Sequence, residues 1–423
     1  MKIISTLIAG SLLLAVGSFA AEPSAANSDQ YVSKKDYDAL KLEFEQMKSQ
    51  MQALTKRNAP AMDGAAYEDL SKQVAEAKQL AKDSLLGSTK FHVGGYAAAG
   101  FSDVRGGDAA FTANFNPILL WKLSDRLLFE GELELQLEGN STSTALEMAQ
   151  ISYLLNDYMT IGAGKFLNPM NYFVERQHMA WVNKLPDKPL AVYDGLLPES
   201  MLGVQLRGAI PAGPTKFGYA FYVANAPSLI VEGDDASTIG TLEYNNFDNA
   251  NGHIAVGGRV GFYPIPELEL GYGFQLSDVG PAGNSADALL QSVDLSYVHD
   301  SSFLKGVVNF HTQWVWSQIS GVNYDTGGGA FTFPNRRNGG YVQLAYRPTH
   351  FGSALVRDFE PVIRYDRLSQ AQTPVGYDQQ RWTFGLNYWL GASTVVKVAY
   401  SLDDKTAGAG NADTFWLQFA MGF

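Results

Sequence analysis

From Phe91 onward, apolar and polar residues alternate in segments of roughly ten residues. Short turn-like links and longer stretches rich in Gly, Asp and Asn separate these segments in turn. Since successive side chains of a β-strand point to opposite faces, each segment predicts a strand with one apolar and one polar face. Alternating short and long connections are typical of outer-membrane barrels. We therefore expect an all-β fold over 88–423, a transmembrane antiparallel β-barrel of about 16 strands.

The alternation is clearest at the C-terminus. One face of the last segment holds Phe415, Leu417, Phe419, Met421 and Phe423. An even number of strands is expected for a single-chain bacterial barrel, which agrees with the number of alternating segments. The expected strands are 91–101, 110–122, 127–139, 145–155, 158–167, 200–210, 214–225, 252–263, 267–278, 288–299, 303–317, 340–348, 354–368, 380–390, 394–403 and 412–423.

Charged residues fall on the polar faces of several strands. The face of 127–139 opposite its leucines carries Glu130, Glu132, Glu134 and Glu138. Other inner faces are predicted to carry Arg207, Arg259, Arg347, Arg364, Arg381 and Lys397. All ten are candidate pore-lining residues, although any single one can be an ordinary solvated wall residue. Two facing walls of opposite sign would create a transverse field that orients dipolar solutes.

The segment 168–199 shows no clean alternation. It contains four prolines, which a central strand does not accommodate. A loop this long in a compact barrel is usually functional, so we expect it to fold inward and narrow the lumen. Its candidate charged residues are Glu175, Arg176, Lys184, Asp187 and Lys188. An outward surface loop is the alternative.

The segment 33–87, which precedes the predicted barrel, has a different spacing of apolar residues. Apolar residues recur there at three and four positions, as at the a and d sites of a heptad: Tyr37, Leu40, Phe44, Met47, Met51 and Leu54. The pattern predicts an α-helical coiled coil, and acids at g with lysines at e favour a parallel self-assembly. A single amphipathic helix on another surface is the alternative. The residues at the a and d positions do not decide whether the coiled coil has two or three helices.

The first twenty residues have the pattern of a secretory signal peptide. Lys2 precedes an apolar run, and Ser18-Phe19-Ala20 forms a small-residue cleavage site before Ala21. The run is too short for a transmembrane anchor. Export makes lipid a simpler partner for the many apolar strand faces than the second sheet of a soluble sandwich. The sequence thus predicts a signal peptide at 1–20 and a periplasmic coiled coil at 33–87.

Composition and charge narrow the possible functions. With no Cys, the chain has no disulfide and no thiolate ligand for a metal or haem, and we expect no cofactor. A net charge of −12 argues against nucleic-acid binding. The six His are scattered without a readable nucleophile–base grouping, so we expect no enzyme. From Ser88 on, the chain contains 21 Lys and Arg residues and 32 Asp and Glu residues. This excess of acidic residues disfavours a strongly anion-attracting lumen.

Several short segments resemble the phosphate-selective porin O and P family. The run 359–368 (FEPVIRYDRL) looks like that family's late-strand signature, and 385–390, 395–401 and 417–423 are similar to its last three strands. The run 164–170 resembles its entrance to the constriction loop. A coiled coil also precedes the barrel in some trimeric members of this wider group. The resemblance implies a trimeric, sixteen-stranded diffusion channel. The family's dense arginine ladder and lysine cluster have no match here, so phosphate selectivity is not carried over.

The expected function is an outer-membrane porin for passive diffusion of small hydrophilic solutes and ions, weakly selective with a lean toward cations. The expected partners are membrane lipid and two further copies of the chain. Resemblance to porins also implies that Phe423 closes the signal read by the barrel-assembly machinery. Two alternatives stay open, namely an anion- or phosphate-selective channel and a structural tether of the outer membrane through the coiled coil.

Overall fold

A computed structural model describes 91–138, 140–193, 195–233, 238–249, 251–281, 284–325, 329–369, 378–406 and 411–423. The chain splits into two units, Met1–Thr89 and Lys90–Phe423, and all described residues belong to the second. The predicted signal peptide and the coiled coil, with its seam from Tyr37 to Leu54, lie outside the described residues. In the described part of the chain, no helix is long and apolar enough to cross a membrane.

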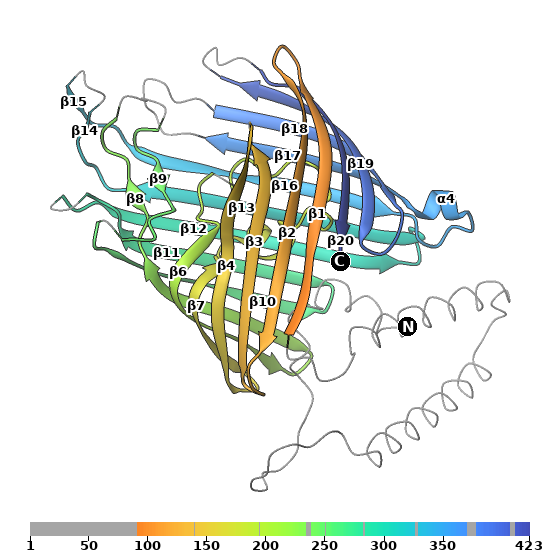
Figure 1. Ribbon diagram of the computed structural model, residues 1–423, viewed down its shortest axis with the longest axis horizontal. Coiled ribbons are helices and arrows are strands. Elements are labelled where there is room, and N and C mark those ends of the chain that lie inside the picture. The colour runs from red at the N-terminus through yellow and green to blue at the C-terminus, as the bar shows by residue number, and fades with distance from the viewer. Residues whose placement is uncertain are drawn as a thin grey trace, which may run out of the picture. The chain divides into compact units, whose positions relative to one another are not determined.

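Sixteen antiparallel strands form a closed barrel (Figure 1), which confirms the predicted fold. Each strand pairs with its neighbour along the chain, and β1 pairs with β20 to close the ring. The barrel strands are β1 Phe91–Val104, β2 Ala109–Lys122, β3 Leu127–Glu138, β4 Ser141–Asn156, β5 Met159–Leu167, β6 Ser200–Ala212, β7 Thr215–Asn225, β10 Ile254–Ile265, β11 Leu268–Asp278, β12 Asp287–Ser301, β13 Gly306–Ile319, β16 Asn335–Arg347, β17 Phe359–Ser369, β18 Asp378–Trp389, β19 Thr394–Lys405 and β20 Thr414–Gly422.

Each expected segment corresponds to one barrel strand, with two kinds of difference. The first residues of the expected strand 354–368 form a short helix, α4 Ala354–Arg357. Arg347 stabilises this turn by donating to the carbonyl oxygen of Arg357 and to the carboxylate of Asp358. The long connections also contain two small hairpins that were not predicted: β8 Ser228–Leu229 with β9 Leu242–Glu243, and β14 Tyr324–Asp325 with β15 Ala330–Phe331.

The two faces of the sheet have opposite character. Trp382, Phe384 and Leu386 of β18 are exposed on the outside, whereas Thr383 and Asn387, at the alternate positions, are buried inside. A soluble protein buries its apolar side chains and exposes its polar ones. Here the arrangement is reversed, because the apolar side chains are on the outer surface of the protein. A closed ring has no second sheet to cover them, which rules out a soluble sandwich. The apolar outer face is suited to lipid.

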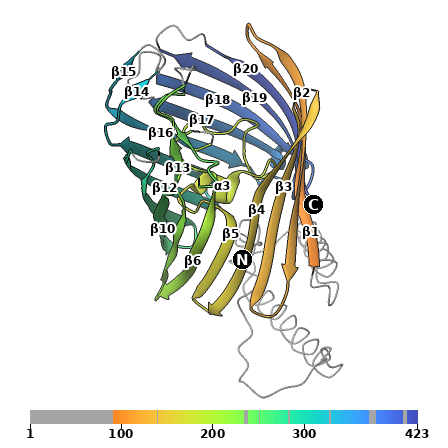
Figure 2. The same ribbon diagram turned by 60° about the vertical axis from the view of Figure 1, so that its left-hand side comes forward.

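The main buried cluster lies inside the barrel rather than between layers. The segment 168–199, which contains helix α3 Tyr172–Gln177, lies within the ring of strands (Figure 2). It packs Met170, Phe173 and Leu197 against inner-face residues such as Leu290 of β12 and Tyr341 of β16. The segment is therefore built as part of the barrel interior, as an inward-folding loop requires.

Candidate functional site

The loop 168–199 is closed at its base by asparagines. The backbone N–H of Asn168 donates to the carbonyl of Glu199 (2.9 Å), and its side chain donates to the carbonyl of Pro198 (3.1 Å). Asn171 caps α3 by accepting from the N–H of Val174, and its amide donates to the carbonyl of Val192 (2.6 Å). Amide side chains that satisfy otherwise unpaired backbone groups fix the shape of a proline-rich segment.

Polar residues of β12 and β13 hold the first part of the loop. The carbonyl of Met170 accepts from Ser292 and from Gln313, both at 3.0 Å. The amide oxygen of Gln313 also accepts from the N–H of Phe173 (3.2 Å). These neutral residues were not predicted as site residues, because their role depends on a contact between residues more than a hundred positions apart.

The second part of the loop is held by charges on the inner face of β17, β18 and β19, which we call the clamp wall. Asp187 accepts from Arg364 (2.6 Å) and Thr383 (3.2 Å) and forms an ion pair with Arg381 (3.3 Å). Arg364 also pairs with Asp366 (2.7 Å) and is completely buried. A buried arginine held by two carboxylates is locked by geometry and charge together.

Lysines complete the clamp wall. Lys184 of the loop pairs with Glu360 (2.8 Å), and Lys397 donates to the carbonyls of Ala180 and Asn183. The predictions for Arg364, Arg381 and Lys397 therefore need correction. All three lie on the inner face, but they are covered by the loop and bind it, so they are not open pore-lining residues. The physical reason is that the loop offers carbonyls and Asp187 as partners, which the alternation cannot reveal.

The other predicted cations are paired as well. Arg207 donates to Glu175 of the loop (2.6 Å), and Arg259 pairs with Asp294 (2.5 Å) and Glu269 (2.8 Å). Arg347 lies beside the turn at α4, where it pairs with Asp358 (3.1 Å), so it supports that turn instead of lining the constriction.

Glu175 is the loop residue on which two cations converge. Arg176 lies 3.3 Å from it in addition to Arg207. Burial alone would raise the pKa of Glu175, but the charges of Arg207 and Arg176 outweigh burial and lower the pKa below its usual value. Glu175 is therefore held as a carboxylate.

Another part of the inner wall, on β3 and β4, is acidic. We use the name acidic wall for Glu130, Glu132 and Glu134 of β3 together with Glu147 of β4. Glu130 accepts from Gln150 (2.9 Å), and Glu132 is almost fully buried beside His178 of the loop. The inner-face placement of the first three agrees with the predicted alternation. The side chain of Glu138 is outside the described set, so its predicted role stays a prediction.

Glu147 was not predicted, and a β-bulge explains it. Glu132 of β3 pairs with Met148, but the next residue, Leu133, pairs with Leu146, so Glu147 is the extra residue of β4. A bulge changes the direction in which a side chain points, and Glu147 lines the same pocket as Glu134. One signal was available in the sequence. Simple alternation would put Glu147 on the lipid face beside Ile151, where a charge is costly.

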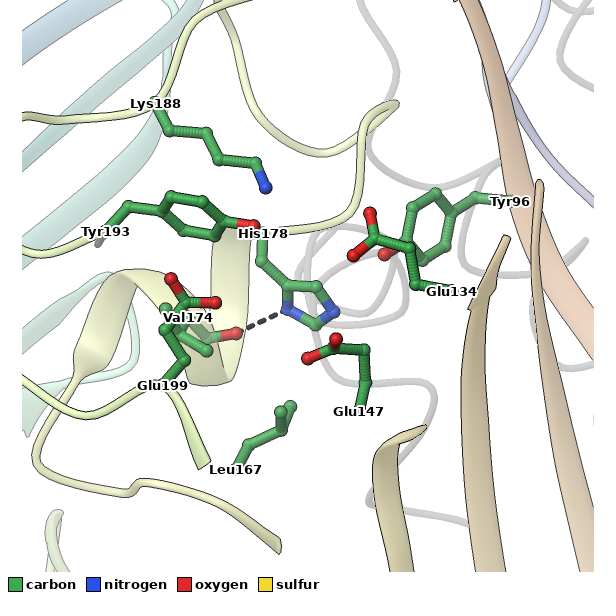
Figure 3. Close-up of a pocket in the computed structure, with 9 residues that line it drawn as sticks. All are labelled: Tyr96, Glu134, Glu147, Leu167, Val174, His178, Lys188, Tyr193 and Glu199. Carbon is green, nitrogen blue, oxygen red and sulfur yellow. Dashed lines mark hydrogen bonds between the residues drawn. The ribbon is translucent and has the colours of Figure 1, made fainter. Parts of the chain in front are cut away.

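A pocket separates the loop from the acidic wall (Figure 3). The lining residues are Tyr96, Glu134, Glu147, Leu167, Val174, His178, Lys188, Tyr193 and Glu199. Three carboxylates and one lysine therefore meet around it, and the ammonium of Lys188 lies 3.3 Å from the ring centre of Tyr193. A small pocket with charged lining of this kind can bind and orient ions and polar solutes.

No family model and no curated protein matches this chain. Solved structures do resemble it: OmpF of Salmonella typhi in complex with daunomycin (13% identity, TM-score 0.51) and Pseudomonas putida OprB (9%, 0.52). The outer membrane channel DcaP of Acinetobacter baumannii is a third (10%, 0.51). Each likeness covers 79% of this chain, and 97%, 94% and 97% of the respective neighbour. At these identities the likeness shows the fold, which is that of the outer-membrane porins.

Proposed function

We propose that this chain is an outer-membrane porin, a water-filled channel through which small hydrophilic solutes and ions diffuse passively. The supporting observation is the combination of a closed barrel with an apolar outer face and an inward loop that leaves a charged pocket beside the acidic wall. A loop held by two buried carboxylate–arginine contacts and a lysine pair keeps the lumen narrow. Narrowing by a fixed loop is the means by which such a pore selects solutes by size.

The channel is weakly selective and leans toward cations. Arg364, Arg381 and Arg259 each have a carboxylate partner, so their charges are neutralised locally. Glu134 and Glu147 face the pocket, and no described residue lies within ion-pair distance of either. Wall charges in a narrow wet pore act over about 10 Å at 0.1 M salt. The excess of carboxylates at the pocket therefore favours cations by a small margin.

Planar-bilayer recording of the purified full-length protein tests the channel itself. We expect stepwise conductance increases as single channels insert, together with swelling of protein-containing liposomes in small sugars and no swelling in large ones. Loss of both signals with correctly folded, heat-modifiable protein would contradict the proposal.

One observation favours a second candidate, an anion-selective channel. Arg337 on the inner face of β16 is only 8% exposed, its Nε has no hydrogen-bond partner, and within the described residues no carboxylate pairs with it. An unpaired buried guanidinium can attract an anion. Block of the current by millimolar phosphate, lost in Arg337→Gln, would support this candidate over the first.

Assembly is part of the same proposal. The chain is exported by the signal at 1–20, forms a homotrimer, and carries the coiled coil at 33–87 in the periplasm. Recognition of Phe423 by the assembly machinery fits its position: Phe423 exchanges backbone hydrogen bonds with Gly95 (3.0 and 3.1 Å) and stacks on Phe115. Crosslinking in membranes tests the trimer. The yield of folded barrel after deletion of Phe423 tests the signal.

A further inference from the structure

His178 connects the loop to the acidic wall. Its Nε2 lies 3.3 Å from a carboxylate oxygen of Glu132. Its ring also packs edge-on against Tyr96 of β1, with 6.0 Å between ring centroids. This contact joins two ionisable side chains, one from the loop and one from the acidic wall.

The surroundings of the ring determine its protonation. Nδ1 of His178 faces the carbonyl oxygen of Val174 in α3 (Figure 3), and Nε2 faces Glu132. A carbonyl oxygen can only accept, and a carboxylate can only accept. Because both ring nitrogens face acceptors, both must carry a proton for the two hydrogen bonds to form. A neutral imidazole can donate to only one of these two acceptors, so the geometry favours an imidazolium paired with a carboxylate.

We propose that His178 is a positioning residue that, while protonated, ties the constriction loop to the acidic wall and neutralises Glu132, and that loss of its proton releases the tie and adds one negative charge to the pocket. This inference rests on the proposed channel function, because its readout is ion conduction. On this proposal, the net charge of the pocket depends on the protonation of His178, and therefore on pH.

The titratable and charged neighbours of His178 come from β1, β3, β4 and the loop itself. Glu132 and Glu134 lie on β3, Glu147 on β4 and Tyr96 on β1, and the loop itself contributes Lys188, Tyr193 and Glu199. Burial alone would lower the pKa of His178. The hydrogen bond and charge of Glu132 and the carbonyl of Val174 outweigh both burial and the charge of Lys188, so the pKa is raised above its usual value.

The sign of the effect follows from this raised pKa. Below it, the His178–Glu132 pair is neutral and the tie is intact. Above it, a neutral imidazole presents a lone pair to the Glu132 carboxylate, which loses its hydrogen bond and its countercharge. The tie stabilises the folded loop fully below the ordinary histidine range and loses this stabilisation as pH rises through the raised pKa. The preference for K⁺ over Cl⁻ should therefore increase at the alkaline end.

The experiment measures reversal potentials of the full-length protein in a KCl gradient from about pH 5 to about pH 9, the range around histidine titration. Wild type should gain K⁺ selectivity in a step at the upper part of this range. His178→Gln should conduct without that step, because its amide still donates to Glu132 but does not titrate. Glu132→Gln should keep a step but move it to lower pH, since the carboxylate that favours the imidazolium is gone.

His350→Gln is the matched control. His350 also pairs with a carboxylate, Asp300 (2.8 Å), but at the turn beside β12 and away from the pocket, so this variant should retain the wild-type step. An identical pH profile in wild type and His178→Gln would overturn the inference while leaving the channel intact. A step that stays at the same pH in Glu132→Gln would overturn it equally. Absence of conductance in every variant and in wild type would instead overturn the proposed function, and this inference with it.

Discussion

The clamp wall and the acidic wall look alike in the sequence, since each is a row of charges at alternate strand positions. Their environments differ, apart from that of Glu132, which is buried and paired with His178 of the loop. Arg364 of the clamp wall is fully buried and meets two carboxylates, whereas Glu134 and Glu147 of the acidic wall line a pocket without an ion-pair partner among the described residues. The charges of the clamp wall therefore hold the constriction loop in place, whereas Glu134 and Glu147 act on the ions that pass through the pore.

This difference has an energetic cause. A carboxylate or guanidinium that leaves water needs a partner, so the buried cations of the clamp wall are useful only as part of a fully paired network. Charges that keep contact with water in the lumen need no partner and retain their field. Substituting a residue that holds the loop is therefore expected to change the structure of the loop. Substituting an open carboxylate is expected to change the ion selectivity.

The largest expected effect comes from breaking the clamp wall. Asp187→Asn removes the charge that Arg364 and Arg381 share. Loss of one partner of a buried ion pair costs about 3–5 kcal/mol, which is enough to detach the loop. We expect a higher single-channel conductance and faster proteolysis within 168–199. Asp358→Asn is the control, because its pair with Arg347 is partly exposed and is worth about 1 kcal/mol or less. Equal conductance in both variants would contradict the division between the walls.

A smaller effect is expected from the acidic wall. The double substitution Glu134→Gln and Glu147→Gln should shift selectivity toward anions with little change in conductance, since the volume of the side chains is conserved. Glu130→Gln is the comparison variant, because Glu130 already accepts from Gln150 and should contribute less. The structure thus sharpens the expectation of four equivalent acids in β3, since Glu132 is paired with His178 and Glu147 comes from β4. A large conductance change with unchanged selectivity would argue against open charges here.

Salt should weaken the lean toward cations further. The screening length falls from about 10 Å at 0.1 M to about 3 Å at 1 M, so carboxylates at the wall no longer reach the centre of the pore. The K⁺ preference of wild type should decrease steadily as both sides of the bilayer are raised to high KCl. A preference independent of salt would point to steric filtering by the loop instead of wall charge.

The smallest expected effect concerns acid. The pKa of Glu175 is lowered in the folded loop, so its pair with Arg207 stabilises the loop at every pH above the ordinary glutamate pKa of about 4.3. This stabilisation is lost as the pH falls through the lowered pKa. Conductance should therefore stay constant down to the ordinary range and change only below it. Glu175→Gln should show the altered conductance already at neutral pH. A wild-type conductance of this variant at neutral pH would show that Glu175 does not stabilise the loop.

The strands could be read from the sequence because their signal is local. The period of two is repeated within each segment, and the four prolines of 168–199 exclude a strand without reference to any other residue. Non-local features escaped prediction. The bulge at Glu147 depends on the register between β3 and β4, and the contact of Gln313 with Met170 joins positions far apart in the chain. Alternation correctly placed Arg364 and Lys397 on the inner face, but it could not show that the loop covers them.

In the proposed channel, the open carboxylates Glu134 and Glu147 set ion preference, and the buried cations of the clamp wall do not. The reversal potential of the wild-type protein in a roughly tenfold KCl gradient at about 0.1 M mean salt tests it most directly, because wall charge is only partly screened there. We expect a small potential of the sign that favours K⁺, and we expect the double substitution of Glu134 and Glu147 to Gln to shift it toward Cl⁻. A clearly anion-selective potential in wild type, or one that the double substitution leaves unchanged, would contradict it.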